Sequence, residues 1–482
     1  MFDYSITFMD FWGRFFSFPK LERKRTVPKN PTIKTRGEIM STKLFTFKGG
    51  VHPPTNKALT QNVPIEKAVD PKVVVIPMSQ HIGAPCDPLV KVGDTVKVGQ
   101  KIGESKAFMS VPVHSSVSGT VKKIEQRTVP NGSKVNCVII ESDGNFDVHE
   151  SVQPKGKVED LTKEQILSII KEGGMAGMGG ATFPTHVKLS PPPDKPIDTL
   201  LVNAAECEPY LTCDHRTMVE KPELVLLGIK AIMKALGVNK CYIGIEKNKP
   251  DAIEIMGKTV AGEEGIEVAP LEVKYPQGDE KRIINAITGR VVPSGALPME
   301  VGCVVENVGT VATIGNIIKT GMPLIERVVT VSGSAIQNPK NLSVRIGTTY
   351  KDVIEQCGGY KEEPGKLISG GPMMGFAQYT DEVPVIKGTS GILAFTKKEA
   401  DLSEPSNCIM CGRCLEACPV QLMPYKISRY SIQKNFDAAD EYHAADCIEC
   451  GGCSYICPAK RPLKETISVA KKEILARRRK AK

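Results

Sequence analysis

Eight cysteines near the C-terminus combine a residue type and a spacing that bind iron. They form two runs of the pattern C-x2-C-x2-C-x3-C-P, one within residues 408–419 and the other within 447–458. Three thiolates in one tight loop hold three corners of a [4Fe–4S] cubane, and the fourth cysteine, one helical turn further on, reaches the neighbouring cluster. The pattern therefore predicts two [4Fe–4S] clusters, one bound by Cys408, Cys411, Cys414 and Cys457, the other by Cys447, Cys450, Cys453 and Cys418.

Other uses of these cysteines fit the spacing less well. Zinc ribbons use pairs of C-x2-C, not two fourfold runs that each end in proline. Disulfides form in oxidising compartments, and we recognise no secretory signal in the sequence. The other seven of the 15 cysteines share no spacing, and we expect them to be reduced packing residues. A domain over residues 400–462 is thus expected to carry single electrons through two clusters.

A glycine-rich stretch over residues 173–188 is the second candidate for cofactor binding. Gly177, Gly179 and Gly180 let backbone N–H groups approach a phosphate closely, and Lys188 adds a positive charge. Taken alone, such a stretch is more commonly a flexible loop. Its meaning therefore depends on the elements around it.

Strands and helices alternate after this stretch, which predicts a mostly parallel sheet in an α/β domain over 161–325. The expected strands are 199–204, 240–246, 266–274 and 301–306, and the expected helices are 222–236, 250–261, 279–288 and 310–319. Parallel sheets bind ligands at the carboxyl ends of their strands. Polar and small residues follow three of these strands: Asn203, Glu206 and Glu208, then Tyr275, Gly278 and Glu280, then Asn307 and Thr310. Together with the glycines they predict one cofactor site.

The rest of the chain predicts a multidomain α/β and β protein. Residues 72–142 resemble a lipoyl-like barrel-sandwich hybrid, with related half-motifs at 92–99 and 117–121. Lys106 lies near the hairpin tip where carrier domains present a modified lysine, but no Met-Lys-Met is present, which favours a structural adaptor. Residues 326–395 predict a β-grasp-like module. Residues 41–71 are a loop-rich segment with a short strand expected at its start, over 44–54, and 143–160 are a linker.

Both ends of the chain are basic, and the formal net charge is +9. Residues 1–40 combine eight aromatics with a basic run, which suits an interfacial membrane anchor, a partner-docking segment, or an extension upstream of a true start at Met40. Residues 463–482 predict a basic helix, either a solvated helix end or a contact to an anionic membrane surface or acidic partner. Nothing else in the sequence indicates nucleic acid. No apolar run is long enough to span a bilayer.

Over residues 41–460 the order of motifs resembles the RnfC family. The resemblance is carried by Phe47-Lys-Gly-Gly-Val-His-Pro-Pro, the hybrid barrel, the glycine-rich loop, the Asn-x-x-Glu-x-Glu-Pro loop, the β-grasp module and the doubled cysteine motif. RnfC is the NADH-side subunit of the Rnf complex, a membrane-bound ferredoxin:NAD⁺ oxidoreductase that translocates Na⁺ or H⁺. The resemblance implies non-covalent FMN, NAD(H) as substrate, and a peripheral position on the cytoplasmic face of the cell membrane. It also implies membrane-integral and ferredoxin-like subunits as partners.

The α/β domain is also similar to the flavin subunit of respiratory complex I, which implies roles for individual residues. Gly177, Gly179, Gly180 and Lys188 would face the FMN phosphate and ribityl chain. Asn203, Glu206 and Glu208 would line the isoalloxazine and the nicotinamide, with the two glutamates as catalytic candidates. Tyr275, Gly278 and Glu280 would flank the ring, and Asn307 and Thr310 the phosphate. The chain departs from the complex I pattern at Ala205, where that family carries an acid, and at Tyr210, where it carries a small residue.

A flavin beside two cubanes resolves a mismatch in electron number. NADH delivers a hydride, and each cluster accepts one electron, so a cofactor that takes pairs and releases single electrons belongs between them. Two alternatives stay open. One is a cobalamin reductase of propanediol-utilising microcompartments, with a similar domain order, which would sediment with shells and not with membranes. The other is a non-enzymatic iron–sulfur adaptor, which would purify with iron and without flavin.

Overall fold

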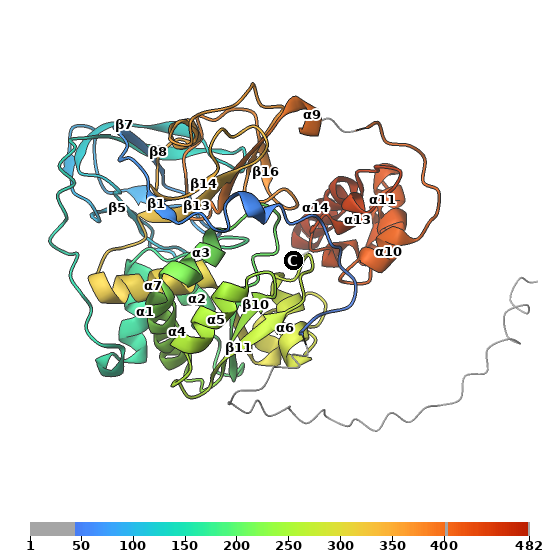
Figure 1. Ribbon diagram of the computed structural model, residues 1–482, viewed down its shortest axis with the longest axis horizontal. Coiled ribbons are helices and arrows are strands. Elements are labelled where there is room, and N and C mark those ends of the chain that lie inside the picture. Colours follow the sequence, from blue (N-terminus) through green and yellow to red (C-terminus); the bar gives the residue numbers. More distant parts are fainter. Residues whose placement is uncertain (1–43, 401–402, 481–482) are drawn as a thin grey trace, which may run out of the picture. The chain divides into compact units, whose positions relative to one another are not determined.

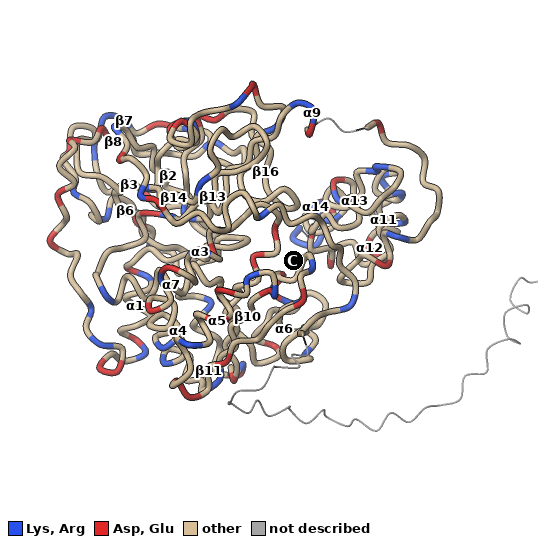
Figure 2. The backbone as a smooth tube through the Cα atoms, in the orientation of Figure 1, with Lys and Arg blue, Asp and Glu red and all other residues tan. Residues whose placement is uncertain are grey.

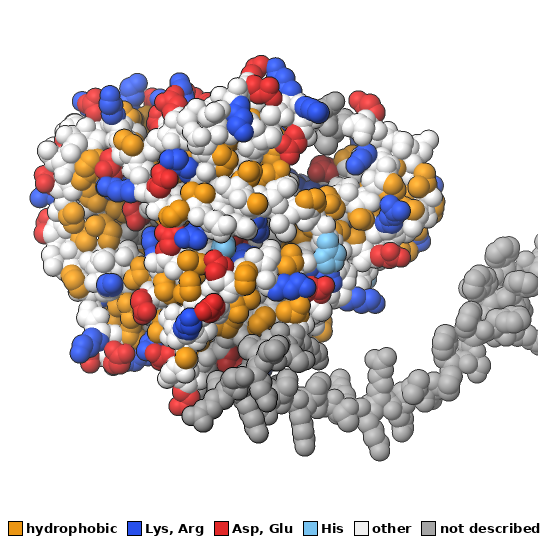
Figure 3. Space-filling view, in the orientation of Figure 1, with side chains coloured by type: hydrophobic (Ala, Val, Ile, Leu, Met, Phe, Trp, Pro, Cys, Tyr) orange, Lys and Arg blue, Asp and Glu red, His pale blue; other side chains and the backbone are white. Residues whose placement is uncertain are grey.

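The structure is a computed structural model that describes residues 44–400 and 403–480 (Figure 1). The aromatic and basic segment at residues 1–40 lies outside the described residues. Within the described part, none of the helices has both the length and the apolar character needed to cross a bilayer. Hydrophobic and charged side chains alternate over the face seen in Figure 3, as is usual for protein surfaces.

A four-stranded parallel sheet forms the centre of the α/β domain, as predicted. Its order is β11 (Ile266–Leu271), β10 (Cys241–Glu246), β9 (Thr199–Ala204) and β12 (Cys303–Asn307). Asn203 lies opposite both Gly244 and Asn307 in the register. This brings the polar strand ends to one edge of the sheet, because parallel strands end together.

The α/β domain contains the helices α1 (Lys163–Glu172), α2 (Thr185–Lys188), α4 (Pro222–Leu236), α5 (Pro250–Thr259), α6 (Glu280–Thr288) and α7 (Val308–Thr320). Helices α1, α4, α5 and α7 bury their apolar faces in one core, and α6 buries Ile283 and Ile284 in a second one. Thr162 and Gln165 form a capping box at α1, and Pro222 and Gly237 bracket α4. Helices α4 and α7 approach very closely, since a Cβ on Gly228 would lie 1.9 Å from the carbonyl oxygen of Val311. The predicted helices all form, within a few residues of their expected ends.

Helix α3 (Cys213–Glu220) was not predicted from the sequence. Its N-cap, Thr212, makes no side-chain capping bond, and its eight residues carry a weak apolar stripe. A distant side chain completes the first turn instead, because Glu206 accepts a hydrogen bond from the backbone N–H of Asp214 at 2.7 Å. Tertiary contact, not local sequence, therefore defines this helix.

The barrel-sandwich hybrid consists of two small sheets around a Val/Ile core. One sheet has the order β2 (Val73–Pro77), β8 (Lys134–Ser142), β7 (Gly119–Thr128) and β4 (Thr95–Val96), and the other β3 (Asp87–Pro88), β5 (Lys101–Glu104) and β6 (Val113–His114). Lys106 is exposed in the loop after β5. That loop docks on α2, where the His186 ring contacts the carbonyl oxygen of Phe108 at 3.1 Å.

The β-grasp module is a six-stranded sheet packed around α8 (Tyr350–Glu355). Its order is β1 (Ile65–Lys67), β14 (Lys340–Arg345), β13 (Glu326–Ser332), β17 (Gly391–Phe395), β15 (Lys366–Ser369) and β16 (Phe376–Gln378). Strand β1 comes from the segment expected to be loop-rich. The strand expected over 44–54 does not form. Only isolated bridges at Phe45 and Val51 occur there, because Gly49 and Gly50 adopt φ values of 86° and 88° that end a ladder.

The cysteine runs lie among short helices that pack on a long terminal one. These are α10 (Arg413–Ala417), α11 (Pro424–Ile432), α12 (Phe436–Glu441), α13 (Gly452–Tyr455) and α14 (Leu463–Lys480). Basic residues follow one another in the last turn of α14 (blue in Figure 2). Two of them pair with α12: Arg477 with Asp437 at 3.2 Å and Arg478 with Asp440 at 2.7 Å. Part of the predicted basic helix is thus used within the fold.

A buried lysine joins three parts of the chain. Lys387, between β16 and β17, is 1% exposed and donates to the carbonyl oxygens of Pro112 and Gly174, both at 2.7 Å. Burial lowers the pKa of Lys387 to about 7. Lys387→Met would leave two buried carbonyls without donors, at a cost of about 2 to 4 kcal/mol. We expect the urea midpoint of the full chain to fall; an unchanged midpoint would contradict this bonding role.

Candidate flavin site and iron–sulfur centres

The glycine-rich loop packs on the N-terminus of α7. The hydroxyl of Thr310 accepts a hydrogen bond from the Met178 backbone N–H at 2.9 Å, and a Cβ on Gly179 would lie 3.3 Å from the Asn307 side chain. Asn307 caps α7 by accepting from the backbone N–H groups of Gly309 and Thr310. The predicted phosphate-side residues therefore meet at the positive end of a 13-residue helix.

Two amides of this loop are available to a ligand. Among residues 44–400 and 403–480, no protein acceptor contacts the backbone N–H groups of Gly179 and Gly180. Gly180 has φ +71°, and no heavy atom lies within 4 Å of where its Cβ would be. Free amides beside a helix N-terminus form a cradle for an anionic group such as a phosphate.

Lys188 lies beside two acids. Its ammonium donates to Glu280 at 2.9 Å and to the Val305 carbonyl at 2.8 Å, and it lies 3.9 Å from Glu306. Burial would lower the pKa of Lys188, but Glu306 and Glu280 outweigh it and raise this pKa. Burial raises the pKa of Glu306 to about 7. Much of the positive charge of Lys188 is therefore balanced within the protein.

Asn203 and Gly278 bring two strand-end loops together. The Asn203 side-chain amide donates to the Gly278 carbonyl at 2.8 Å, and the Gly278 N–H donates to the sulfur of Cys207 at 3.3 Å. A Cβ on Gly278 would lie 3.3 Å from the Asn203 side chain. Any larger residue at position 278 would push these loops apart.

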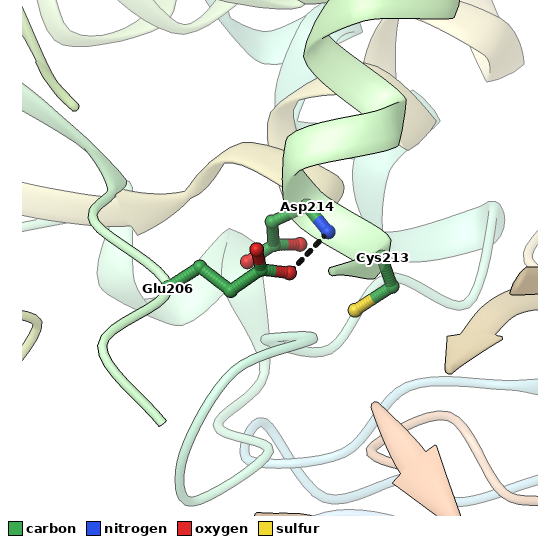
Figure 4. A group of neighbouring side chains, drawn as sticks. All are labelled: Glu206, Cys213 and Asp214. Carbon is green, nitrogen blue, oxygen red and sulfur yellow. Dashed lines mark hydrogen bonds between the residues drawn. The ribbon is translucent and has the colours of Figure 1, made fainter. Parts of the chain in front are cut away.

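Glu206 lies in a buried group of acids (Figure 4). Its side chain is 3% exposed, and burial raises its pKa to about 7. Oxygens and sulfur of Glu206, Cys213 and Asp214 lie within 4.8 Å of one another, a spacing that suits a divalent cation. The nearby Lys57 ammonium, 3.7 Å from Glu206, and the Asn307 amide, 2.7 Å from Asp214, already provide positive partners, so we assign no metal here.

Glu208 points toward the β-grasp module. Its two carboxylate oxygens accept hydrogen bonds from the backbone N–H groups of Met373 and Met374, both at 3.0 Å. A Cβ on Gly371 would lie 2.3 Å from a Glu208 oxygen, so only glycine permits this contact. Burial raises the pKa of Glu208 to about 7, and the two amides oppose this shift. Both candidate glutamates are thus buried and bound within the protein.

Two buried lysines that the sequence analysis missed hold the same loop. Lys57 donates to the carbonyl oxygens of Glu208, at 3.0 Å, and of Leu211, and Lys249 donates to that of Ala205 at 2.7 Å. Burial lowers the pKa of Lys57, and Glu206 opposes that shift. Lysines are almost never fully buried unless paired, but their burial is not visible in a single sequence. The one sequence feature that could have drawn attention to Lys57 is its position seven residues after the Gly49-Gly50 pair.

The fourth cysteine of each run lies with the first three cysteines of the other run. Burial raises the pKa of Cys453, and the thiolates of Cys447, Cys450 and Cys418 raise it further. Burial likewise raises the pKa of Cys414, and Cys408 and Cys457 add to the shift. Cys418 therefore lies with the second run, and Cys457 with the first.

The two cysteine groups differ in exposure. Cys408 and Cys411 are exposed, and between them Ile409 and Met410 are 67% and 69% exposed. Cys450 is 8% exposed. We call the group of Cys447, Cys450, Cys453 and Cys418 the inner cysteine group, and that of Cys408, Cys411, Cys414 and Cys457 the outer one.

The inner cysteine group packs on the loops that follow β9 and β11 and that contain Cys207 and Tyr275. We call these two loops the flavin-side loops. Val51, Tyr275, Ala417 and Cys450 form one buried cluster, with Cys207 and Met373 against it. A Cβ on Gly49 would lie 2.7 Å from the carbonyl oxygen of Cys418, and a Cβ on Gly50 would lie 2.7 Å from that of Tyr275. The two glycines therefore lie between the inner cysteine group and the loop after β11. The glycines of the Phe47–Pro54 motif are therefore needed for close approach.

Family models match most of this architecture. The RnfC barrel sandwich hybrid domain matches residues 45–145, the Nuo51 FMN-binding domain 170–316, the SLBB domain 328–377, and the 4Fe-4S dicluster domain 400–458. The C subunit of the Na⁺-translocating ferredoxin:NAD⁺ oxidoreductase complex of Acetobacterium woodii is 53% identical over 92% of this chain and 100% of its own length. The chain belongs to the RnfC family.

Two other RnfC proteins align over much of the chain. The C subunit of the proton-translocating ferredoxin:NAD⁺ oxidoreductase complex of Clostridium ljungdahlii is 52% identical over 89% of this chain and 94% of its own length. The C subunit of the ion-translocating oxidoreductase complex of Rhodobacter capsulatus is 41% identical over 80% of this chain and 74% of its own length. The predicted fold class is confirmed, and so are the predicted cofactors, FMN and two [4Fe–4S] clusters.

The residues of this RnfC chain fit those groups. The free amides of Gly179 and Gly180 suit the FMN phosphate, and a buried Glu206 oxygen that accepts no hydrogen bond among the described residues lies in the loop on the ring side. In the inner group the thiols of Cys447, Cys450 and Cys418 act on the pKa of Cys453, and in the outer group those of Cys408 and Cys457 act on that of Cys414. Each group therefore combines thiols of both runs, as two cubanes with an exchanged fourth ligand require. The individual FMN contacts stay predictions.

Gly179→Ala tests the phosphate cradle. The new Cβ would lie 3.3 Å from Asn307, which must shift and loosen the cap of α7. We expect the FMN dissociation constant to rise about tenfold, or about 1.4 kcal/mol, measured by flavin fluorescence quenching. Gly257→Ala is the control, because Gly257 lies in α5 with no heavy atom near its Cβ position. Equal FMN affinity in both variants would contradict the cradle.

Proposed function

We propose that the chain exchanges hydride with NAD(H) at FMN and conducts single electrons through its two clusters, as the RnfC component of an ion-translocating ferredoxin:NAD⁺ oxidoreductase complex. The observation that carries this proposal is the packing of Tyr275 and Cys207 from the flavin-side loops on Cys450 of the inner group. When bound, FMN accepts the electron pair of a hydride and releases electrons singly, and each cluster carries one electron.

In this proposal, the difference in burial between the two cysteine groups sets the order in which electrons pass through the two clusters. The inner group lies against the flavin-side loops, and the outer group, with its exposed Cys408 and Cys411, is where a partner protein exchanges electrons. The exposed Ile409 and Met410 offer a partner an apolar contact beside the cluster. Burial of the inner group keeps water away from it.

Each predicted site residue has a part in this arrangement. Gly177, Gly179 and Gly180, with Asn307 and Thr310, hold the phosphate end, and Lys188 and Glu280 form the charged wall beside it. Asn203 and Gly278 set the spacing of the loops under the ring. Glu206 and Glu208 are proposed to line the ring and the nicotinamide, and with pKa values of about 7 both stand between charge states at neutral pH.

The relatives' names also suggest where the protein works. We propose a peripheral position on the cytoplasmic face of the cell membrane, held by membrane-integral and ferredoxin-like subunits of the complex. Residues 1–40 and the free basic residues of α14 would add contacts to the membrane surface.

The test uses the full chain, reconstituted anaerobically with iron, sulfide and FMN. NADH is added stepwise while flavin absorbance and cluster EPR are followed. Bleaching of the flavin with growth of the cluster signals is the expected result. Clusters that respond to dithionite but not to NADH, with FMN lost on washing, would contradict the proposal and favour an iron–sulfur adaptor.

A further inference from the structure

Tyr275 connects the flavin-side loops to the inner cysteine group directly. Its side chain is 1% exposed, and its hydroxyl donates a hydrogen bond to the backbone carbonyl oxygen of Cys450 at 2.8 Å. Its backbone is held from the other side, because Tyr275 and Val51 exchange two N–H···O bonds, each of 2.8 Å. The hydroxyl is therefore fixed in position and cannot turn to water.

Tyr275 also lies close to the loop that contains Glu208, which is proposed to line the flavin ring. The Tyr275 hydroxyl lies close enough to Glu208 to oppose the rise in pKa that burial causes there. Cys207, next to Glu208, packs in the same buried cluster. One side chain thus touches the loop proposed to line the flavin and the loop that holds a cluster ligand.

A hydrogen bond to the backbone carbonyl of a ligand residue changes the energy of an electron added to the cluster beside it. Hydrogen bonds around the cluster and exclusion of solvent are main determinants of its reduction potential. The hydroxyl directs its positive end toward Cys450, and in a buried, weakly screened place such a dipole acts strongly. Its presence favours the reduced, more negative cluster.

We propose that Tyr275 is a positioning residue that raises the reduction potential of the inner cluster and so favours electron transfer to it from reduced flavin. With both groups bound, one electron would pass from reduced FMN to the oxidised cluster, and no atom would be transferred between them. The inference rests on the proposed function. It assigns to Tyr275 a role toward the cluster in addition to its expected place beside the flavin ring.

Tyr275→Phe removes one oxygen and keeps the ring. The reconstituted protein is titrated with dithionite under redox mediators, and the EPR signals of the two clusters are followed separately. We expect the midpoint potential of the inner cluster to fall and that of the outer cluster to stay unchanged. In stopped-flow experiments with NADH, cluster reduction should slow about tenfold relative to flavin bleaching in the same variant.

Tyr350→Phe is the matched control. Tyr350 is equally buried, and its hydroxyl contacts Ser369 at 2.6 Å in the β-grasp module, so both potentials should stay as in the unmutated protein. An unchanged inner-cluster potential in Tyr275→Phe, or an equal fall of both potentials, would overturn the inference. Because dithionite supplies the electrons, this result is obtained even if NADH fails to reduce the flavin, which would contradict the proposed function instead.

Discussion

Replacing Cys418 by alanine is expected to remove the inner cluster, although Cys418 belongs to the first cysteine run. Its thiolate lies with those of Cys447, Cys450 and Cys453. A cubane that loses one of four ligands in a buried site is not retained. The iron content should fall by half. NADH should still bleach the flavin, but the outer cluster should no longer be reduced, because its only route from the flavin is broken.

Cys457→Ala is the reciprocal variant. It removes a ligand from the outer group, so iron again falls by half, but NADH should now reduce the remaining inner cluster. EPR after NADH addition distinguishes the two variants. If Cys418→Ala kept NADH-driven reduction of its remaining cluster and Cys457→Ala lost it, the proposed order of the clusters would be reversed.

Lys57→Met is expected to weaken FMN binding about a hundredfold. The variant leaves the buried Glu206 carboxylate without its cation and the carbonyls of Glu208 and Leu211 without their donor. Removal of one partner from a buried pair costs about 3 to 5 kcal/mol, and about 3 kcal/mol corresponds to a hundredfold change in a dissociation constant. The loop must then be re-ordered each time FMN binds.

The defect should depend on pH in a defined direction. Burial raises the pKa of Glu206 to about 7, and Lys57 opposes that rise, so the variant has a still higher pKa there. A carboxyl with a raised pKa favours the folded loop at low pH and loses this contribution as pH rises through that pKa. FMN affinity in Lys57→Met should therefore recover between about pH 8 and about pH 6.

Lys387→Met provides the comparison for this experiment. Lys387 is also a buried lysine that donates to two carbonyls, but no carboxylate contacts its ammonium among the residues that the structure describes. Its loss should lower stability without a pH-dependent change in FMN affinity. The same pH dependence in both variants would rule out the specific pairing of Lys57 with Glu206.

Much of the site was accessible from the sequence because its signals are local. The spacing of the cysteines, the glycines before α2, and the polar residues after β9, β11 and β12 each lie in one short stretch. The parallel order of the sheet then brings those strand ends to one edge without further information. The alternation of strands and helices correctly predicted that the sheet is parallel.

The parts that were missed depend on contacts between distant segments. Helix α3 relies on Glu206, strand β1 pairs with β14, and the Gly49–Gly50 pair lets the carbonyls of Cys418 and Tyr275 approach closely. None of these residues has a neighbour in sequence that reveals its partner.

The sequence by itself predicted the chemistry proposed for this protein: eight thiolates for two clusters, glycines for a phosphate, and a sheet to present them. Only the tertiary structure decided which cluster ligands face the flavin-side loops, that Lys57 and Lys249 hold those loops, and that Glu208 is bound by Met373 and Met374. The physical reason is that burial and long-range pairing are properties of the packed chain. Local spacing encodes which ligands are present, but not the charge balance and distances around them.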